Sequence, residues 1–393
     1  MAGAEIFDSE EIKAMADVIE RKMIHRYGSH DSRKGQYRVD EFEDKAKAIT
    51  GAKHALALSS GTAALIVALK GIGIKPGDEV ITTPFTFIAT IEAIVACDAV
   101  PILGDIDETL SLSPASVEKL ITPKTKAIMP VHMFGVAADM DGFAALGKKF
   151  GIPIIEDACE VVGGTYKGRY LGTLGTCGTW SFDPNKTLTI GEGGMVLTND
   201  EAIYSRMEYY HDHGHVHSKA HDRGADAKSG LGVNYRISEI QGALGLVALD
   251  KMPMALGMLR ATKGKILCAV AETGIRPRPE NDTSGGDTAT HVIFLLPTAS
   301  AARKFQVATA EAGCKCAIIA ENTWHYAKHW QALADMGEKD FFGTKMPSYA
   351  PATMAASDAI LSRAVMFGLN IRMDDASVNR IIAAIRAGAK AAL

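Results

Sequence analysis

The stretch HALALSSGTAALIVALKGIGI, residues 54–74, contains a strand pattern that runs directly into a helix pattern. HALALSS (54–60) is a short apolar run of the kind found in buried strands. GTAALIVALKGIGI (61–74) has the spacing of an apolar helix and ends in glycines, which commonly terminate helices. This junction predicts the first βαβ unit of a parallel sheet.

The same alternation continues along the chain. Helices are predicted at 86–98 and 139–150, and strands at DEVITTP (78–84), AVPILGDID (99–107), TKAIMPVHMFG (125–135) and IPIIEDA (152–158). Strands that alternate with helices favour right-handed crossovers and a mainly parallel sheet with helices on both faces.

The pattern of predicted elements changes after residue 240. A long helix (237–271) leads into the linker-like PRPENDTSGGD (277–287). After it we expect strands at HVIFLLP (291–297) and CAIIA (316–320), a helix at 300–313 and a closing amphipathic helix at 374–393. The 393 residues exceed what one core usually holds, so we expect a large domain, 1–250 with an N-terminal helix, and a small α+β domain, 251–393.

Composition excludes several classes of protein. A net charge of −4 and the absence of any lysine or arginine run argue against a nucleic-acid partner. The apolar stretch 80–103 is divided by Pro84, Glu92, Asp98 and Pro101, so no membrane segment is expected. The N-terminus lacks the apolar core of a signal peptide, and six scattered cysteines without zinc spacing favour a reducing cytoplasm.

Two nucleotide-binding motifs are also excluded. GFAALGKK (142–149) nearly matches a P-loop, but Lys149 stands where Ser or Thr should hold magnesium, and the stretch lies inside a helix pattern. No G-x-G-x-x-G follows the strand at 54–60, so nicotinamide binding has no support.

The chemistry is indicated by SFDPNKTLTIGEGG (181–194), where Lys186 lies between a proline-broken strand and a glycine-rich turn. A lone lysine is usually a surface charge, but three other features provide what pyridoxal phosphate needs. SSGTAAL (59–65) offers a helix N-terminus for phosphate. Asp157 ends a strand and can pair with the pyridinium nitrogen, and PFTF (84–87) brings Phe85 and Phe87 to a strand end where an aromatic face can stack on the ring.

The ordered motifs SSGTAA, P-x-TF, EDA, SF-x-P-x-K-x-x-x-x-GEGG and NYRISEIQ resemble the DegT/DnrJ/StrS family of sugar aminotransferases. That family has the fold-type-I architecture of aspartate aminotransferase, and the resemblance runs from about residue 5 to the C-terminus. It implies that pyridoxal 5'-phosphate is the cofactor. Carried over by position, the phosphate would be held by Gly61, Thr62, Ala63 and Ser181. The ring would be held by Phe87, Asp157 and a Schiff base to Lys186, and Asn234 would reach the phosphate of the neighbouring subunit in a homodimer.

One position departs from the family pattern. Glu160 stands where these enzymes commonly carry Gln or His near the phenolic oxygen of the cofactor. A carboxylate there would repel the negative form of that oxygen unless Glu160 is protonated or points away. Relatives with histidine in place of the lysine are dehydratases, so the presence of Lys186 favours transamination.

HDHGHVHSKAH (211–221) contains five of the twelve histidines. As a strand, it would point its alternate imidazoles to one side, where they could bind a metal. Gly214 breaks such a strand and no cysteine or carboxylate cluster completes a ligand set, so we expect no metal site. We favour sugar contacts from His213, His215, His217 and Arg223 over packing or a solvent-facing loop.

The pattern DHGHVHSKAHDRGAD followed by GLGVNYRISEI is most similar to aminotransferases that act at carbon eight of Kdo, a lipopolysaccharide sugar. The expected reaction therefore moves an amino group from L-glutamate to a keto-sugar, with 8-oxo-Kdo as the preferred acceptor. Lys186 is the expected proton carrier, and Asp157 is the second expected catalytic residue, as the partner of the ring nitrogen. A nucleotide-linked 3- or 4-keto deoxysugar and a non-catalytic cofactor-binding regulator are the alternatives.

Overall fold

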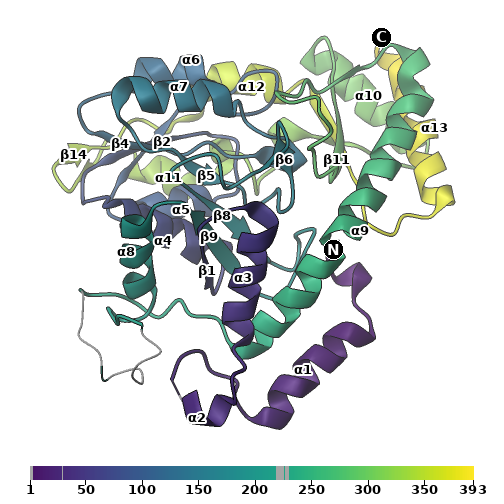
Figure 1. Ribbon diagram of the computed structural model, residues 1–393. Helices are drawn as coiled ribbons and strands as arrows, with labels where there is room; N and C mark the ends of the chain where they lie inside the picture. The colour runs from purple at the N-terminus through teal and green to yellow at the C-terminus, as the bar shows by residue number, and fades with distance from the viewer. Residues whose placement is uncertain (1–2, 29, 218–224, 226–229) are drawn as a thin grey trace.

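The computed structural model describes residues 3–28, 30–217, 225 and 230–393. Its centre is a sheet that helices cover on both faces (Figure 1). A four-stranded part, ordered β1-β9-β8-β5, and a three-stranded part, β3-β2-β4, are joined by the parallel bridges Ile128–Ile154 and Val131–Asp157. Among these strands only β9 runs antiparallel, so the expected mainly parallel sheet is confirmed.

The strands of this sheet follow the predicted order along the chain. Their bounds are β1 His54–Leu58, β2 Glu79–Thr82, β3 Val100–Leu103, β4 Thr125–Ile128, β5 Ile155–Asp157, β8 Cys177–Ser181 and β9 Gly194–Thr198. Side chains alternate between the two faces, as the pleat requires. In β1, for example, Ala55 and Ala57 join one apolar cluster, whereas Leu56 and Leu58 join the other.

The helices of the large unit divide between those two faces. One cluster includes side chains of α4 (Gly61–Ile72), α5 (Ala89–Ala96) and α8 (Glu201–His211). The other includes side chains of α3 (Arg38–Thr50), α6 (Pro114–Leu120), α7 (Met140–Phe150) and the long α9 (Glu239–Val270). The P-loop lookalike at 142–149 lies inside α7, as predicted.

The apolar stretch 80–103 is folded as predicted, into parts of β2 and β3 with α5 between them. Among the described helices, α9 with the turn after it (Glu239–Thr273) is the one long and apolar enough to cross a membrane by length and composition. Of its most apolar window, 56% is buried inside the protein, and a core helix meets the same criterion.

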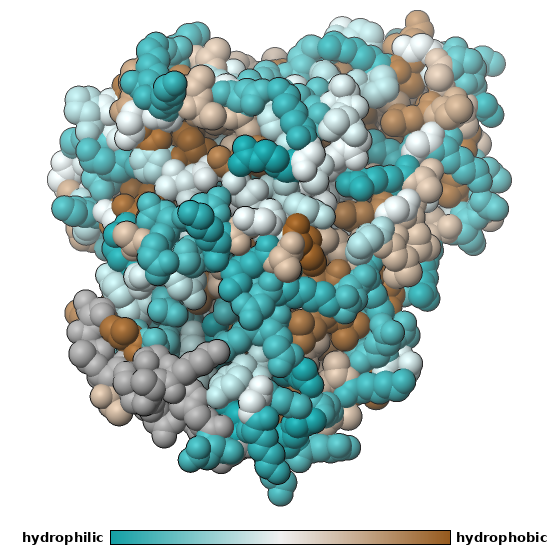
Figure 2. All heavy atoms as spheres, viewed as in Figure 1, coloured by the Kyte–Doolittle hydropathy of each residue, from teal (hydrophilic) through white to brown (hydrophobic). Residues whose placement is uncertain are grey.

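The N-terminal region contains η1 (Gly3–Ile6), α1 (Ser9–Arg21) and the short α2 (His30–Arg33). A capping box starts α1: the Asp8 side chain accepts from the helix N-terminus, and the Asp8 N–H donates to Glu11 at 2.8 Å. The predicted N-terminal helix is therefore present. Hydrophilic residues predominate on this lower part of the molecule in the view of Figure 2.

The C-terminal part has its own antiparallel sheet, ordered β10-β11-β15-β12. Its bounds are β10 Arg276–Pro277, β11 His291–Leu295, β12 Ala317–Ile318 and β15 Ala364–Gly368. The helices α10 (Ala299–Glu311) and α13 (Asp375–Ala392) pack against each other beside it (Figure 1). The predicted α+β arrangement is present, although β15, which lies inside the sheet, was not predicted.

The remaining elements are short. They are β6 Thr165–Tyr166, β7 Arg169–Tyr170, β13 Asp340–Phe341, β14 Thr344–Lys345, α11 Gln331–Met336, α12 Ala355–Leu361, and the 3-10 turns η2 Met133–Gly135, η3 Ala271–Thr273, η4 Ile319–Glu321, η5 Ala327–His329 and η6 Pro351–Met354. The boundary proposed at residues 250 and 251 falls inside α9, which is continuous there.

Candidate active site

A pocket of about 490 Å³ lies where the parallel strands end. Strands that run parallel bring their carboxyl ends to one edge of the sheet, so motifs far apart in sequence meet there. Of the residues proposed from sequence, those that line this pocket are Gly61, Thr62, Phe87, Asp157, Glu160, Ser181 and Lys186.

The helix N-terminus proposed for phosphate lies on one wall of the pocket. Ser60 is the N-cap of α4, and its Oγ accepts from the N–H of Ala63 at 3.0 Å. A Cβ on Gly61 would lie 2.8 Å from Cβ and 2.9 Å from Oγ of Ser181, so this close approach requires glycine. The start of α4 and the Ser181 hydroxyl thus converge on the same space.

Gly194, at the start of β9, makes this convergence possible. It pairs with Leu58 of β1 and Ser181 of β8, so it lies between the two strand ends that form the wall. A Cβ there would lie only 2.1 Å from the backbone oxygen of Ser60. The glycine-rich turn after Lys186 is therefore needed for close packing of the backbone around the proposed phosphate site.

Ala63 differs from the other residues proposed for phosphate. It is 3% exposed, and its N–H is already engaged by Ser60. Gly61 and Thr62 line the pocket, whereas Ala63 secures the cap of the helix that presents them.

Asp157 ends β5 and is 4% exposed. Its Oδ2 accepts from Thr90 Oγ1 at 2.7 Å, and the Thr90 hydroxyl also bonds with that of Thr86 at 2.6 Å. Its Oδ1 accepts from the N–H of Cys159 at 3.2 Å. These bonds hold the carboxylate in one orientation in the pocket wall, as a charged partner for a ring nitrogen needs.

Lys186 lies across the pocket with its Nζ 3.4 Å from Oε1 of Glu160. Burial alone would lower the pKa of the Lys186 ammonium, but the negative charges around it, that of Glu160 above all, outweigh burial and raise the pKa. The ammonium form is therefore favoured in the ligand-free pocket.

Glu160 is held by three groups. Besides Lys186, His325 Nε2 lies 3.1 Å from Oε1, and the N–H of Phe134 donates to Oε2 at 3.2 Å. Burial alone would raise the pKa of Glu160, but the charge of Lys186 and the bond with His325 lower it well below the usual range. Of the alternatives left open by the sequence, a protonated Glu160 is therefore disfavoured, and the carboxylate faces Lys186 and His325.

The bond from Phe134 depends on an unusual backbone conformation. Phe134 has φ of 50°, a left-handed conformation that is costly for an aromatic residue. The turn is secured on both sides, because Arg278 Nη1 donates to the Met133 oxygen at 2.8 Å and the Thr288 N–H donates to the Gly135 oxygen at 3.1 Å. This strained turn directs a backbone N–H at Glu160.

Phe87 is the aromatic residue of the PFTF motif that lines the pocket. Lys186 Nζ lies 6.0 Å from the centre of its ring. Phe85, the other aromatic residue of the PFTF motif, is fully buried and packs against Phe134 instead.

Two residues that the sequence did not point to, Trp324 and His325, line the pocket from the C-terminal part of the chain. The segment TWHY (323–326) matches none of the sequence motifs described above. Backbone pairing of Phe85 with Tyr326 helps to bring this segment to the site.

The described residues of the histidine run do not line this pocket. His211 is buried and bonds through Nε2 with the Tyr27 hydroxyl at 2.9 Å, and His217 stacks on the Tyr27 ring at 3.5 Å. His215 is buried and His213 is exposed. Arg223, also proposed to contact sugar, lies outside the described residues, and within the described part no group of three potential metal ligands occurs.

Asn234 lies in a different surface pocket, lined also by Ile24, His25 and Arg26. It is exposed and pairs with Asp212 across an antiparallel bridge. Within one chain, therefore, Asn234 is not part of the pocket that holds Lys186.

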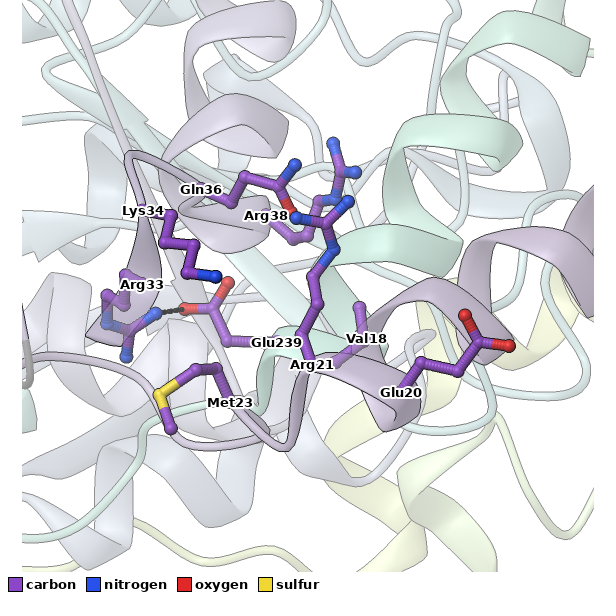
Figure 3. Close-up of a pocket in the computed structure, with 9 residues that line it drawn as sticks. All are labelled: Val18, Glu20, Arg21, Met23, Arg33, Lys34, Gln36, Arg38 and Glu239. Carbon is purple, nitrogen blue, oxygen red and sulfur yellow. Dashed lines mark ion pairs between the residues drawn. The ribbon is translucent and has the colours of Figure 1, made fainter. Parts of the chain in front are cut away.

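A further cavity, of about 300 Å³, lies between α1, the segment 33–38 and the start of α9 (Figure 3). Arg33 pairs with Glu239 at 3.0 Å, and Arg21 and Arg38 both pair with Asp17. Most of its basic side chains are thus already matched by carboxylates, and none of the residues proposed from sequence lines it.

The main pocket fits pyridoxal phosphate. Gly61, Thr62 and Ser181 provide donors around a space that a Cβ would fill, which suits a phosphate. Asp157 provides a fixed carboxylate, and Lys186 provides an amine in the same pocket. This donor set matches the phosphate, ring nitrogen and aldehyde of that cofactor.

Known proteins share both the sequence and the fold. Over 215 residues the chain is 43% identical to GDP-perosamine synthase of Caulobacter vibrioides, an alignment that spans 54% of this chain and 57% of that protein. Over 249 residues it is 36% identical to UDP-2-acetamido-2-deoxy-3-oxo-D-glucuronate aminotransferase of Pseudomonas aeruginosa, which spans 62% of this chain and 67% of that protein. The chain thus matches little more than half the length of the first relative.

The similarity of structure extends further. An aminotransferase structure from Psychrobacter cryohalolentis superimposes with a TM-score of 0.81 at 29% identity, and the match covers 96% of each chain. The sequence profile of a single family matches residues 6–386. The chain therefore belongs to the DegT/DnrJ/EryC1/StrS aminotransferase family.

Proposed function

We propose that this protein is a pyridoxal-phosphate-dependent aminotransferase that moves an amino group from L-glutamate to a keto-sugar. The observation that carries the proposal is the meeting of Lys186, Asp157 and the N-terminus of α4 in one pocket. Each comes from a different strand end, and together they match the three parts of the cofactor that must be held.

The residues of the pocket divide the work of binding. Gly61, Thr62 and Ser181 hold the phosphate, and Asp157 keeps a proton on the ring nitrogen. When bound, the cofactor provides a conjugated ring that accepts the electron pair left when the donor loses its α-proton. Thr90 fixes Asp157 through the 2.7 Å bond to its carboxylate.

Lys186 moves the proton. As a neutral amine, Nζ would take the proton from the α-carbon of glutamate and carry it across the pocket. The reverse transfer serves the keto-sugar. Glu160, 3.4 Å from Nζ, favours the protonated amine and so stabilises Lys186 after it has taken the proton.

Two acceptors are proposed. The resemblance of the segments 212–226 and 230–240 favours 8-oxo-Kdo, which would yield 8-amino-3,8-dideoxy-manno-octulosonate for lipopolysaccharide in the cytoplasm. The names of the two similar proteins above support the alternative, a nucleotide-linked 3- or 4-keto sugar.

A homodimer with shared sites is part of the proposal. Asn234 is exposed and does not line the pocket of its own chain, as expected of a residue that serves the neighbouring subunit. Two apolar side chains near Asn234 are exposed. Ile24, which lines the same surface pocket, is 50% exposed, and Leu231, three residues earlier in the sequence, is 94% exposed. Burial of such side chains favours association of two copies.

The test is a pair of half-reactions followed by absorbance. We expect L-glutamate to convert the lysine-bound cofactor of the purified protein to its amino form. A panel with 8-oxo-Kdo, GDP-4-keto-6-deoxymannose and the 3-oxo sugar UDP-2-acetamido-2-deoxy-3-oxo-D-glucuronate should then show which acceptor restores the original band.

Lys186→Ala should lose the lysine-bound absorption band and turnover but keep its thermal stability, because the phosphate contacts lie on other elements. Lys126→Ala, at an exposed lysine, is the matched control and should behave as the wild type. Near-normal multiple turnover by Lys186→Ala would contradict the mechanism. Binding of cofactor without any glutamate half-reaction in the wild type would instead favour the non-catalytic regulator.

A further inference from the structure

The rim of the pocket carries a large aromatic side chain with no role in the scheme above. Trp324 lines the pocket and is 69% exposed. The other two tryptophans, Trp180 and Trp330, are 0% and 8% exposed. An exposed tryptophan at the mouth of a binding pocket is a candidate for ligand contact, because burial of its ring on binding is favourable.

The backbone around Trp324 is tightly fixed. Asn322 Oδ1 accepts from the N–H groups of Trp324 at 2.9 Å and of His325 at 3.1 Å. The N–H of Thr86 donates to the His325 oxygen at 2.9 Å, and that of Ala327 donates to the Pro84 oxygen at 2.8 Å. The ring is thus presented from a braced segment, which lowers the entropy cost of using it to bind a ligand.

The orientation of the ring relates it to the reacting centre. The rings of Trp324 and Phe87 are nearly parallel, with centroids 6.2 Å apart and an interplanar angle of 13°. Lys186 Nζ lies 6.0 Å from the centre of the Phe87 ring. Phe87 therefore lies near both groups, and the more exposed Trp324 continues the aromatic surface that begins at Phe87.

The chemistry of this rim distinguishes the two substrates. Glutamate is short and carries charges at both ends, so it gains little from an aromatic face. A pyranose ring has hydroxyl edges but apolar C–H faces, which pack well against an indole. The indole N–H of Trp324 donates to no acceptor among the described residues, so it is free to donate to a hydroxyl of the sugar.

We propose that Trp324 is the residue that binds the sugar ring of the amino acceptor, with its indole face against the C–H face of a pyranose. The inference rests on the proposed function and adds a specificity-determining residue to it. It assigns the sugar contact to the segment 322–325 instead of the histidine run. The described part of that run does not line the pocket.

The kinetic test separates donor from acceptor. For Trp324→Ala, the glutamate half-reaction and its reverse with 2-oxoglutarate should be unchanged within about twofold. The KM for GDP-4-keto-6-deoxymannose or for 8-oxo-Kdo, whichever the wild type aminates, should rise about tenfold or more, the loss expected when one stacked ring is removed. Trp324→Phe keeps an aromatic face and should restore most of the affinity.

A binding test uses fluorescence, because Trp324 is the exposed member of the three tryptophans. In the cofactor-loaded pyridoxal form, which cannot aminate a ketone, acrylamide should quench Trp324, and the keto-sugar should protect it. Trp324→Phe should abolish the protectable fraction of the emission.

The outcomes are distinct. Failure of the glutamate half-reaction in the wild type would overturn the proposed function. A working glutamate half-reaction with an equal KM for the sugar in Trp324→Ala and wild type would overturn only the role of Trp324. The role of Trp324 would also be overturned if acrylamide failed to quench it before sugar is added. That result would mean that a second copy of the chain covers Trp324. A glutamate half-reaction without amination of either sugar would overturn the sugar contact together with the acceptor class.

Discussion

Negatively charged side chains surround the amine of Lys186. Glu160 lies 3.4 Å from Lys186, and Asp157 and Asp183 add to the field that raises the pKa of the ammonium. Only a neutral amine attacks the aldehyde of pyridoxal phosphate. The local charges therefore set the pH at which the protein captures its cofactor.

Glu160→Gln should shift that pH downward. Removal of the largest negative charge near Lys186 lowers the pKa of its ammonium, so the neutral amine is present at a lower pH. The measurement is the rate of pyridoxal phosphate uptake by the cofactor-free protein as a function of pH. Glu192→Gln, at another carboxylate in the pocket, is the control and should leave the profile in place. A profile that does not move in Glu160→Gln would show that Glu160 does not control Lys186.

Asp157→Asn should retain cofactor but lose turnover by about a hundredfold or more, since a neutral amide no longer favours the protonated ring nitrogen. Its two bonded neighbours, Thr90 and Cys159, would still hold the side chain in place. Steady-state kinetics with glutamate measure the loss. Thr90→Val, which removes one support but keeps the charge, should cost far less. Equal losses in both variants would mean that Asp157 acts through packing.

At the scale of elements, a buried lysine of α9 bonds with the N-terminal segment. Lys251 Nζ bonds with the Ile6 oxygen at 2.9 Å and with both oxygens of Glu11 at 2.8 and 2.9 Å, and it lies 3.0 Å from Asp8. Lys251 and Glu11 are 8% and 4% exposed. Loss of this amine would leave a buried carboxylate without its partner.

Lys251→Met should therefore destabilise the protein by roughly 2 kcal/mol, in the range for a hydrogen-bonded charge pair removed from a partly buried site. Urea unfolding gives the free energy, and limited proteolysis shows whether residues 3–21 detach first. Lys265→Met is matched on the same helix, where Lys265 pairs with Asp375 at the surface, and it should cost under about 1 kcal/mol. If both variants lose the same stability, the attachment of α1 does not depend on Lys251.

The described part of the histidine run, residues 211–217, packs against the N-terminal region. His211 and His217 contact Tyr27, and Asp212 pairs with both His217 and Arg236. A histidine already engaged in this way is a poor metal ligand.

Prolonged treatment with a chelator should therefore leave both the melting temperature and the glutamate half-reaction unchanged, since proton transfer by Lys186 needs no Lewis acid. Differential scanning calorimetry and metal analysis before and after treatment provide the check. One tightly held metal ion per chain, lost together with stability, would show that the run is a metal site.

At the scale of the whole molecule, the proposal that two chains share each site can be tested. Lys186 and Asp157 belong to one pocket, and Asn234 lies on another surface. Subunit mixing tests whether Asn234 completes the site of a partner. Lys186→Ala and Asn234→Ala homodimers are each expected to be impaired, but their hybrid contains one site with all residues intact.

Random exchange of subunits makes half of the dimers hybrids, so the mixture should recover up to about a quarter of wild-type activity. Mixing Lys186→Ala with Asp157→Asn is the control: both defects lie in the same pocket of each chain, so a hybrid has no intact site. Activity equal to the mean of the two parents in the first mixture would show that Asn234 does not act across the dimer.

The sequence by itself determined the architecture and most of the pocket. Short apolar runs and helical patterns from 54 to 158 predicted the strands and crossovers, because each pattern depends on neighbouring residues alone. Since parallel strands end at a common edge, the motifs with Gly61, Asp157, Ser181 and Lys186 could be brought together without any distance being known.

Only the tertiary structure decided the contacts between segments with no shared pattern. His325 bonds with Glu160 across 165 residues of chain, and Trp324 reaches the pocket because Phe85 pairs with Tyr326. It also placed His211 and His217 against Tyr27. The physical reason is that local patterns specify which face of an element is buried, whereas the partner met by a polar side chain depends on how distant elements pack.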